Sequence, residues 1–117
     1  TANINLPLIM KGNYGWYTSF QIQNTSTTTA ATGTINYVAG PGSDAGKTGP
    51  SISFTIPAGS SITKIQMAGG SSDDLGIFTR FVGSATITAS QPIVAIVNEQ
   101  QAGGTGDVAM SYNGLNQ

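Results

Sequence analysis

The side chains that could carry acid–base or nucleophilic chemistry are few in this chain. Histidine and cysteine are both absent, which removes the usual catalytic triads, cysteine nucleophiles and zinc hydrolase sites. The acids are Asp44, Asp73, Asp74, Glu99 and Asp107. Glycoside hydrolysis needs two carboxylates facing each other across a cleft, and four of these acids lie in expected loops without an obvious partner. We therefore expect that the protein is not an enzyme.

Asp73 and Asp74 form the first candidate site, because they stand side by side in the Gly-rich segment 69–76. Calcium prefers carboxylates and loop carbonyls as ligands. The spacing fits no EF-hand loop, and Asp and Gly are ordinary turn residues, so a solvated turn is the alternative. We expect no cofactor, with calcium at these two aspartates as the one candidate.

Lys11, Glu99 and Asn113 form a candidate covalent cross-link. A lysine on an early strand of a surface sandwich can join an asparagine on the last strand beside a buried acid, and these residues occupy roughly those chain positions. The reaction requires burial, so that the amine is neutral and the acid protonated. The alternative is that Lys11, next to Gly12, lies at an exposed turn.

An aromatic cluster near the N-terminus is a candidate platform for sugar rings. Flat aromatic faces with nearby amides suit carbohydrate. Alternation places Trp16 and Phe20 on one apolar face with Ile22, so we expect these two rings in the core. Tyr14 and Tyr17 remain as candidate glycan contacts.

The Asn24-Thr25-Ser26 sequence is a sequon. In an exported protein it makes Asn24 a candidate glycosylation site. A plain polar turn is the alternative.

These residues are carried by an all-β chain. Period-two alternation returns roughly every 8 to 12 residues, and helical periodicity is almost absent. The pattern predicts a single domain over residues 1–117, an antiparallel β-sandwich of Ig-like or jelly-roll-like type with about eight short strands; a closed barrel is the alternative. We expect strands at 3–10, 16–23, around Ile35 and Tyr37, and at 52–56, 61–67, 80–88, 93–97 and 108–112.

Two of these segments carry more detailed expectations. The alternation of 61–67 breaks near Lys64 and Ile65, which predicts a β-bulge. Residues 93–97 are continuously apolar, which predicts a central strand covered on both faces.

The N-terminal segment can pair in two alternative ways. Ile4, Leu6 and Leu8 alternate with polar positions and are expected to face a core, while Pro7 cannot donate a ladder hydrogen bond and indicates a sheet edge. Residues 1–10 either pair within their own domain or are exchanged into a neighbour by β-strand addition, with these three side chains inserting. Exchange joins subunits head to tail and produces a filament.

The amino-acid composition limits the classes of binding partner that we expect. Charged residues make up 8% of the chain and the net charge is −1, against about 25% charged residues in a typical domain. The four cations are scattered, which argues against nucleic acid and anionic lipid. No apolar run reaches the roughly 18 residues that a membrane span needs. A polar, nearly uncharged surface is typical of extracellular β-proteins and permits close packing of copies.

Four segments also carry a resemblance. Residues 5–10 (NLPLIM), 15–24 (GWYTSFQIQN), 81–85 (FVGSA) and 91–99 (QPIVAIVNE) resemble β-sandwich modules of secreted and cell-surface proteins in filamentous green non-sulfur bacteria and their relatives. The matches extend over most of the chain, apart from the Gly-rich middle loops. The resemblance implies an extracellular or cell-surface location and an all-β fold, and no particular activity.

The sequence therefore predicts a noncatalytic structural subunit of an extracellular filament or surface layer, assembled with copies of itself by addition of the N-terminal strand. The alternative is a carbohydrate-binding or adhesion module of a larger cell-surface protein, whose partners would be glycans.

Overall fold

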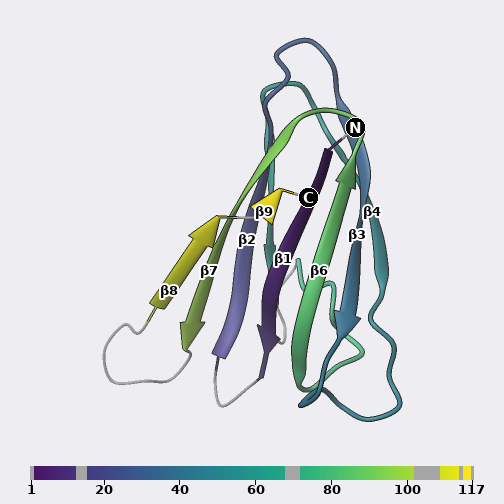
Figure 1. The fold of residues 1–117 in the computed structure, drawn as a ribbon, viewed down its shortest axis with the longest axis vertical. Helices are drawn as coiled ribbons and strands as arrows, with labels where there is room; N and C mark the ends of the chain where they lie inside the picture. Colours follow the sequence, from purple (N-terminus) through teal and green to yellow (C-terminus); the bar gives the residue numbers. More distant parts are fainter. Residues whose placement is uncertain (1, 13–15, 68–71, 102–108, 114, 117) are drawn as a thin grey trace.

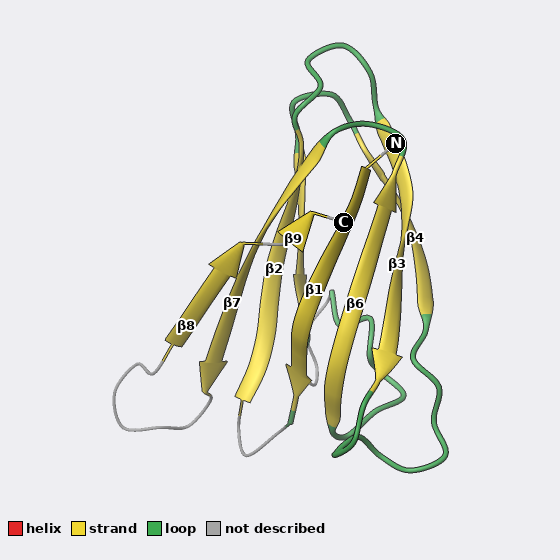
Figure 2. Cartoon of the chain, viewed as in Figure 1, coloured by secondary structure: helices red, strands yellow, loops and turns green. Residues whose placement is uncertain are grey.

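The computed structural model describes residues 2–12, 16–67, 72–101, 109–113 and 115–116. These residues form nine strands joined by loops (Figures 1 and 2). The strands are β1 (Ala2–Lys11), β2 (Trp16–Asn24), β3 (Ala31–Ala39), β4 (Ser51–Ile56), β5 (Ser61–Ile65), β6 (Phe81–Ala89), β7 (Ile93–Gln101), β8 (Ala109–Asn113) and β9 (Leu115–Asn116). The described part contains no helix long and apolar enough to span a membrane.

The strands form two sheets packed face to face. One has the order β4-β3-β6-β1-β9 and the other the order β5-β2-β7-β8, and the paired strands are antiparallel. Figure 1 shows that consecutive strands often lie in different sheets, as when β1 is followed by β2. The prediction of an antiparallel β-sandwich is confirmed.

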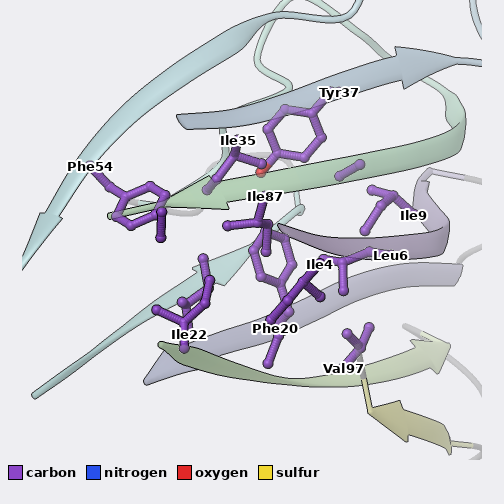
Figure 3. Packing of buried hydrophobic residues seen from close by; sticks show 14 of the residues in the cluster. Ile4, Leu6, Ile9, Phe20, Ile22, Ile35, Tyr37, Phe54, Ile87 and Val97 are labelled. Carbon is purple, nitrogen blue, oxygen red and sulfur yellow. The ribbon is translucent and has the colours of Figure 1, made fainter. Parts of the chain in front are cut away.

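The core lies between the sheets because each strand turns alternate side chains inward. Along β6, Phe81, Ala85 and Ile87 are fully buried, while the residues between them are half-buried. Figure 3 shows how side chains from both sheets meet, with Ile4, Leu6 and Ile87 from one sheet near Phe20 and Ile22 from the other. Each buried aliphatic or aromatic side chain stabilises the fold by about 1.5–3 kcal/mol.

Two strand glycines allow neighbouring strands to approach each other. A Cβ atom on Gly33 would lie 2.0 Å from the carbonyl oxygen of Thr88, and one on Gly83 would lie 2.0 Å from that of Val38. Both positions therefore need a residue without a side chain.

Strand β1 is held between two neighbours, so the expectation that it forms a sheet edge is wrong. It pairs with β6 from Ala2 to Lys11, and with β9 at Ile4 and Asn5. The register with β6 shifts between Leu6 and Ile9, and Pro7 lies in this irregularity. A bulge leaves residues outside the hydrogen-bond ladder, which is how the strand accommodates a proline.

Of the two detailed strand predictions, the bulge is wrong, and the central strand covered on both faces is right in its position and wrong in its covering. β5 pairs with β2 in regular register through Lys64 and Ile65, with no bulge. The alternation breaks because Lys64, opposite the buried Phe20, lies on the inner side of the sheet. β7 is central, between β2 and β8, but Val94 and Ile96 are 44% and 48% exposed, so only one of its faces is covered.

Candidate functional site

Asp73 is occupied by internal partners. Its Oδ2 atom lies 2.6 Å from the Lys11 ammonium, and its Oδ1 atom accepts a hydrogen bond from the backbone N–H of Leu75 at 3.0 Å. The side chains of Lys11 and Asp73 are only 5% and 8% exposed, and the Lys11 ammonium also donates to the Leu75 carbonyl at 2.8 Å. This buried pair ties the end of β1 to the segment that follows β5.

Asp74 is engaged in the same way. Lys64 donates to its Oδ1 atom at 3.1 Å and the Tyr37 hydroxyl donates to its Oδ2 atom at 2.7 Å. Gln66 completes the network, because its amide donates to the Tyr37 hydroxyl and its carbonyl oxygen accepts from the Asp74 backbone N–H. Burial, followed by the hydrogen bond to Asp74, raises the pKa of Tyr37 far above its ordinary value, so the phenol stays protonated and donates.

These contacts do not support the candidate calcium site. All four carboxylate oxygens of Asp73 and Asp74 already accept hydrogen bonds or pair with lysines. A cation would have to displace two ammonium groups. Among the described residues no group of three or more metal-binding side chains occurs.

Glu99 is a further buried acid, and its hydrogen-bond partner is Thr18. It is 1% exposed, and its Oε1 atom accepts a hydrogen bond from the Thr18 hydroxyl, which in turn accepts from the Met10 backbone N–H at 2.7 Å. Its other oxygen, Oε2, has no hydrogen-bond partner within the described part of the chain. Burial raises the pKa of Glu99 to about 7, and the hydrogen bond from Thr18 opposes this shift.

The described contacts give the three cross-link candidates different surroundings. The expectation of an exposed turn at Lys11 is wrong, because that residue is 4% exposed; its ammonium pairs with Asp73, while Glu99 binds Thr18. The Asn113 backbone lies opposite Ile96, three positions along β7 from Glu99, and its side chain is outside the described part. An ion-paired ammonium is not a nucleophile, so this geometry does not favour the bond.

Asn24 is buried, which argues against glycosylation of the folded domain. Its side chain is 0% exposed, and its amide nitrogen donates to the carbonyls of Thr29 and Ile56 at 2.9 and 3.1 Å. Its oxygen accepts the backbone N–H of Ser26 at 3.0 Å. The sequon asparagine therefore fastens the turn after β2, and the amide that would carry a glycan is in use.

The two glycan-contact candidates stand apart from any observed platform. Tyr17 is half-buried on β2, opposite Gln100 of β7. Tyr14 lies outside the described residues. Of the rings expected in the core, Phe20 is 1% exposed, as expected, and Trp16 is half-buried.

Two of the three assembly-strand candidates lie in the core of their own chain. The expectation that Leu8 also faces the core is wrong, because Ile9 is the buried residue after the register shift. Ile4 and Leu6 are 1% and 0% exposed, and Leu8 is half-buried near the register shift. Figure 3 shows Ile4 and Leu6 pointing toward the facing sheet. To insert into a neighbour, these side chains would have to leave this core.

The distribution of charge divides the molecule into distinct regions. The charged residues that the structure describes gather at one end, which we call the charged end, where β1, β3, β5 and β7 finish and β6 begins (Figure 1). Here Asp44 and Lys47 form a third ion pair, 3.3 Å apart, and Lys47 also donates to the Ile77 carbonyl. The charged residues of this end are Lys11, Asp44, Lys47, Lys64, Asp73, Asp74, Arg80 and Glu99.

The outer faces of both sheets are free of described charges. On the β4-β3-β6-β1 sheet many outward positions are hydroxyls and amides in register, such as Ser53, Thr34, Thr88 and Asn3 across four strands, and Val38 of β3 is an exposed apolar residue among them. On the other sheet, β5, β2 and β7 also present uncharged side chains. These outward residues are Ser61, Thr63, Ile65, Tyr17, Ser19, Gln21, Gln23, Val94, Ile96 and Asn98.

One hollow lies near the charged end. It has a volume of about 320 Å³ and is lined by β3 residues and by the segment after it: Tyr37, Val38, Ala39, Lys47, Thr48 and Gly49. Its lining offers one lysine and a protonated tyrosine, without a carboxylate. This set does not provide an acid–base pair.

Sequence reasoning missed the Tyr37–Asp74–Lys64 network, although a signal for it was present. Lys64 occupies a position that the alternation of β5 turns inward, and a charge on an inner face requires a partner. Glu99 gives a similar signal on β7. It follows Ile93 and Val97 on the inward side of that strand, and all three residues are buried.

The two packed antiparallel sheets define the class of protein as a β-sandwich. No protein-family model matches the chain, and no curated protein matches it. Among solved structures, the crystal structure of Thermotoga maritima 1070 is similar, with a TM-score of 0.72 and 18% sequence identity over 97% of this chain and 92% of that chain. At this identity the similarity shows the fold alone.

Proposed function

We propose that this chain is a noncatalytic structural subunit of an extracellular filament or surface layer, in which copies are joined by exchange of β1. In the exchanged state, β1 of one subunit lies beside β6 of the next. Each subunit gives one strand and receives one, so the contact repeats without closing and builds a filament.

The position of β1 is the observation that carries this proposal. It supplies Ile4 and Leu6 to the core, and in the described part of the chain its partner on the side away from β6 is the two-residue strand β9 alone. An exchanged strand makes the same contacts in its neighbour that it makes at home, so exchange loses little contact energy. Ladder hydrogen bonds and apolar burial would both hold the subunits together.

The surface supports the same proposal. Copies that pack closely must not repel each other, and the outer faces of both sheets carry no described charge. The titratable side chains at the charged end are paired with one another or hydrogen-bonded to neutral groups. This arrangement suits a building block better than a catalyst, and the resemblance to secreted modules is consistent with an extracellular location.

A competing peptide tests the proposal. Subunits refolded from denaturant would be examined by electron microscopy and light scattering, with and without an excess of the peptide of residues 2–11. We expect filaments from the protein alone and short chains with the peptide, because the free strand caps the slot beside β6. The matched control is the same peptide with Ile4→Asp and Leu6→Asp, which should leave the filaments long.

Two results would overturn the proposal. One is a protein that stays monomeric under all refolding conditions. The other is a filament whose length is the same with the wild-type and the doubly substituted peptide, because such a filament would be assembled without the β1 slot.

A carbohydrate-binding or adhesion module is the second candidate. It is favoured by Tyr17, which shares an uncharged outer face with Gln21 and Gln23. A glycan array tests it: saturable binding that is lost with Tyr17→Ala supports this function, and an array without binding rejects it.

A further inference from the structure

The outer face of β5, β2 and β7, which we call the β2 face, carries three exposed aliphatic side chains, whereas the described outer face of the other sheet carries one, Val38. Val94 and Ile96 of β7 are 44% and 48% exposed, and Ile65 of β5 is 37% exposed. A sheet with one solvated face normally alternates apolar and polar residues. β7 instead is apolar on both sides over residues 93–97, although only its inner side is covered.

The exposed side chains of β7 lie near the middle of the sheet. Ile96 pairs in register with Gln21, and Val94 pairs with Gln23, both on the adjacent strand β2. Gln21 is also opposite Thr63 of β5, and its amide donates to the Ser61 hydroxyl at 2.9 Å. On the side of β2 and β5, the two aliphatic side chains are therefore bordered by amides and hydroxyls, as an interface core is bordered by its polar rim.

The chemistry of the β2 face selects a neutral protein partner. No charged residue projects from its described positions, because Lys64 lies on the inner side and pairs with Asp74. A charged partner would therefore bury charges without counterparts. Stacking on sugar rings relies on flat aromatic faces, whereas the exposed apolar groups here are branched and aliphatic.

A second copy of the chain meets these requirements. Amides and hydroxyls both donate and accept, so a face composed of them can satisfy itself across a two-fold axis. The same symmetry sets aliphatic side chains against aliphatic side chains, and it brings no like charges together.

We propose that the β2 face packs against the β2 face of a second copy, with Val94 and Ile96 at the centre of the contact. β2 and β7, with nine residues each, and β5, with five, give a footprint of roughly 400 Å² at a strand spacing of about 4.8 Å. Two such faces bury about 800 Å², half of the roughly 1,600 Å² of a standard stable interface. The contact is therefore weak between isolated subunits and becomes strong when many copies are held in line.

The contact does not depend on β1 exchange, but its role as the lateral contact between neighbouring filaments rests on the proposed function. In that role it bundles filaments side by side. β1 exchange determines their length.

Sedimentation equilibrium of the full chain in its unassembled form tests the contact. We expect wild-type subunits to dimerise with a Kd of roughly 0.1–1 mM, the strength of a small transient interface. Ile96→Lys should weaken dimerisation by about tenfold or more, because two lysines would meet at the centre of the contact. The matched control is Val38→Lys, which adds the same charge at an exposed valine of the other sheet and should leave the Kd unchanged.

Several outcomes would overturn the inference. They are a wild-type protein that stays monomeric at millimolar concentration, equal effects of Ile96→Lys and Val38→Lys, and polysaccharide binding by the β2 face without self-association. The peptide competition keeps this test separate from the proposed function: failure of the peptide to shorten filaments removes β1 exchange, and the dimerisation data still decide the fate of the β2 face.

Discussion

The charged end and the two outer faces use side chains in opposite ways. At the charged end, Lys11 and Asp73 are buried together, and Lys64, Tyr37 and Asp74 are linked by hydrogen bonds of 3.1 and 2.7 Å. On the outer faces, most polar side chains face solvent and few are tied to partners. The described contacts of the charged end therefore join distant segments of the chain, whereas the outer faces present uncharged side chains to solvent.

Removing one partner of the buried ion pair should have the largest effect. Lys11→Met leaves the Asp73 carboxylate buried without a counterion and should lower the free energy of unfolding by about 3–5 kcal/mol. Urea denaturation measures the loss. The matched control is Lys47→Met in the exposed pair with Asp44, which should cost no more than about 1 kcal/mol. Equal losses would mean that the charged end is not specially dependent on its buried pair.

The titration of Glu99 should make the stability of the fold depend on pH. Its pKa rises from 4.5 to about 7 on folding, so between these values the folded state holds a proton that the unfolded state has released. The contribution is fully present below pH 4.5 and is lost as the pH rises through 7, by at most about 3 kcal/mol. Urea titrations from pH 4.5 to 8 follow the change, and Glu99→Gln should flatten the curve. A wild-type curve that is already flat would contradict the prediction.

A neutral residue performs a similar fastening role at the opposite, uncharged end. Asn24→Ala removes the donor that serves the carbonyls of Thr29 and Ile56 and should lower the free energy of unfolding by about 1–3 kcal/mol. Thermal unfolding measures it. Asn24→Asp keeps the oxygen that accepts from Ser26 and removes the donor. If Asn24→Asp lowers the free energy of unfolding much less than Asn24→Ala does, the acceptor alone stabilises the turn.

Substitutions on the outer faces should have the smallest effect on stability. Ile96→Lys and Thr34→Lys change side chains that lie on outer faces, and each should shift the free energy of unfolding by no more than about 0.5 kcal/mol. Circular dichroism melting curves are sufficient to test this. If either substitution lowered the free energy of unfolding by more than about 2 kcal/mol, the outer faces would not differ from the charged end in their effect on stability.

The fold was predictable from the sequence where alternation is clean. In β2 and β6 most inward positions are apolar or small, and Phe20, Ile22, Ala85 and Ile87 are buried as expected. Pro7 was a less certain guide, because a missing N–H fits both an edge strand and a bulge. Only the register with β6 distinguishes them.

The candidate sites were less predictable, because they depend on which loops meet. Lys11 and Asp73 are 62 positions apart, and Tyr37 and Asp74 are 37 apart. Local sequence gives the type of each residue but not its partner, so two adjacent aspartates suggested a cation site where the fold supplies lysines. The burial of Asn24 could not be predicted from the sequence either, because the same three residues can form an exposed sequon or a turn with a buried asparagine.

A cysteine pair across β1 and β6 reports directly where β1 lies in the assembled protein. Asn3 and Thr88 are opposite each other in register, and the chain has no cysteine of its own, so Asn3→Cys with Thr88→Cys creates a single disulfide. Thr34→Cys with Ser53→Cys, across β3 and β4, is the matched control and should yield monomers. Strand exchange predicts a ladder of covalent multimers from the β1–β6 pair on a non-reducing denaturing gel, whereas a single monomer band from assembled material would contradict it.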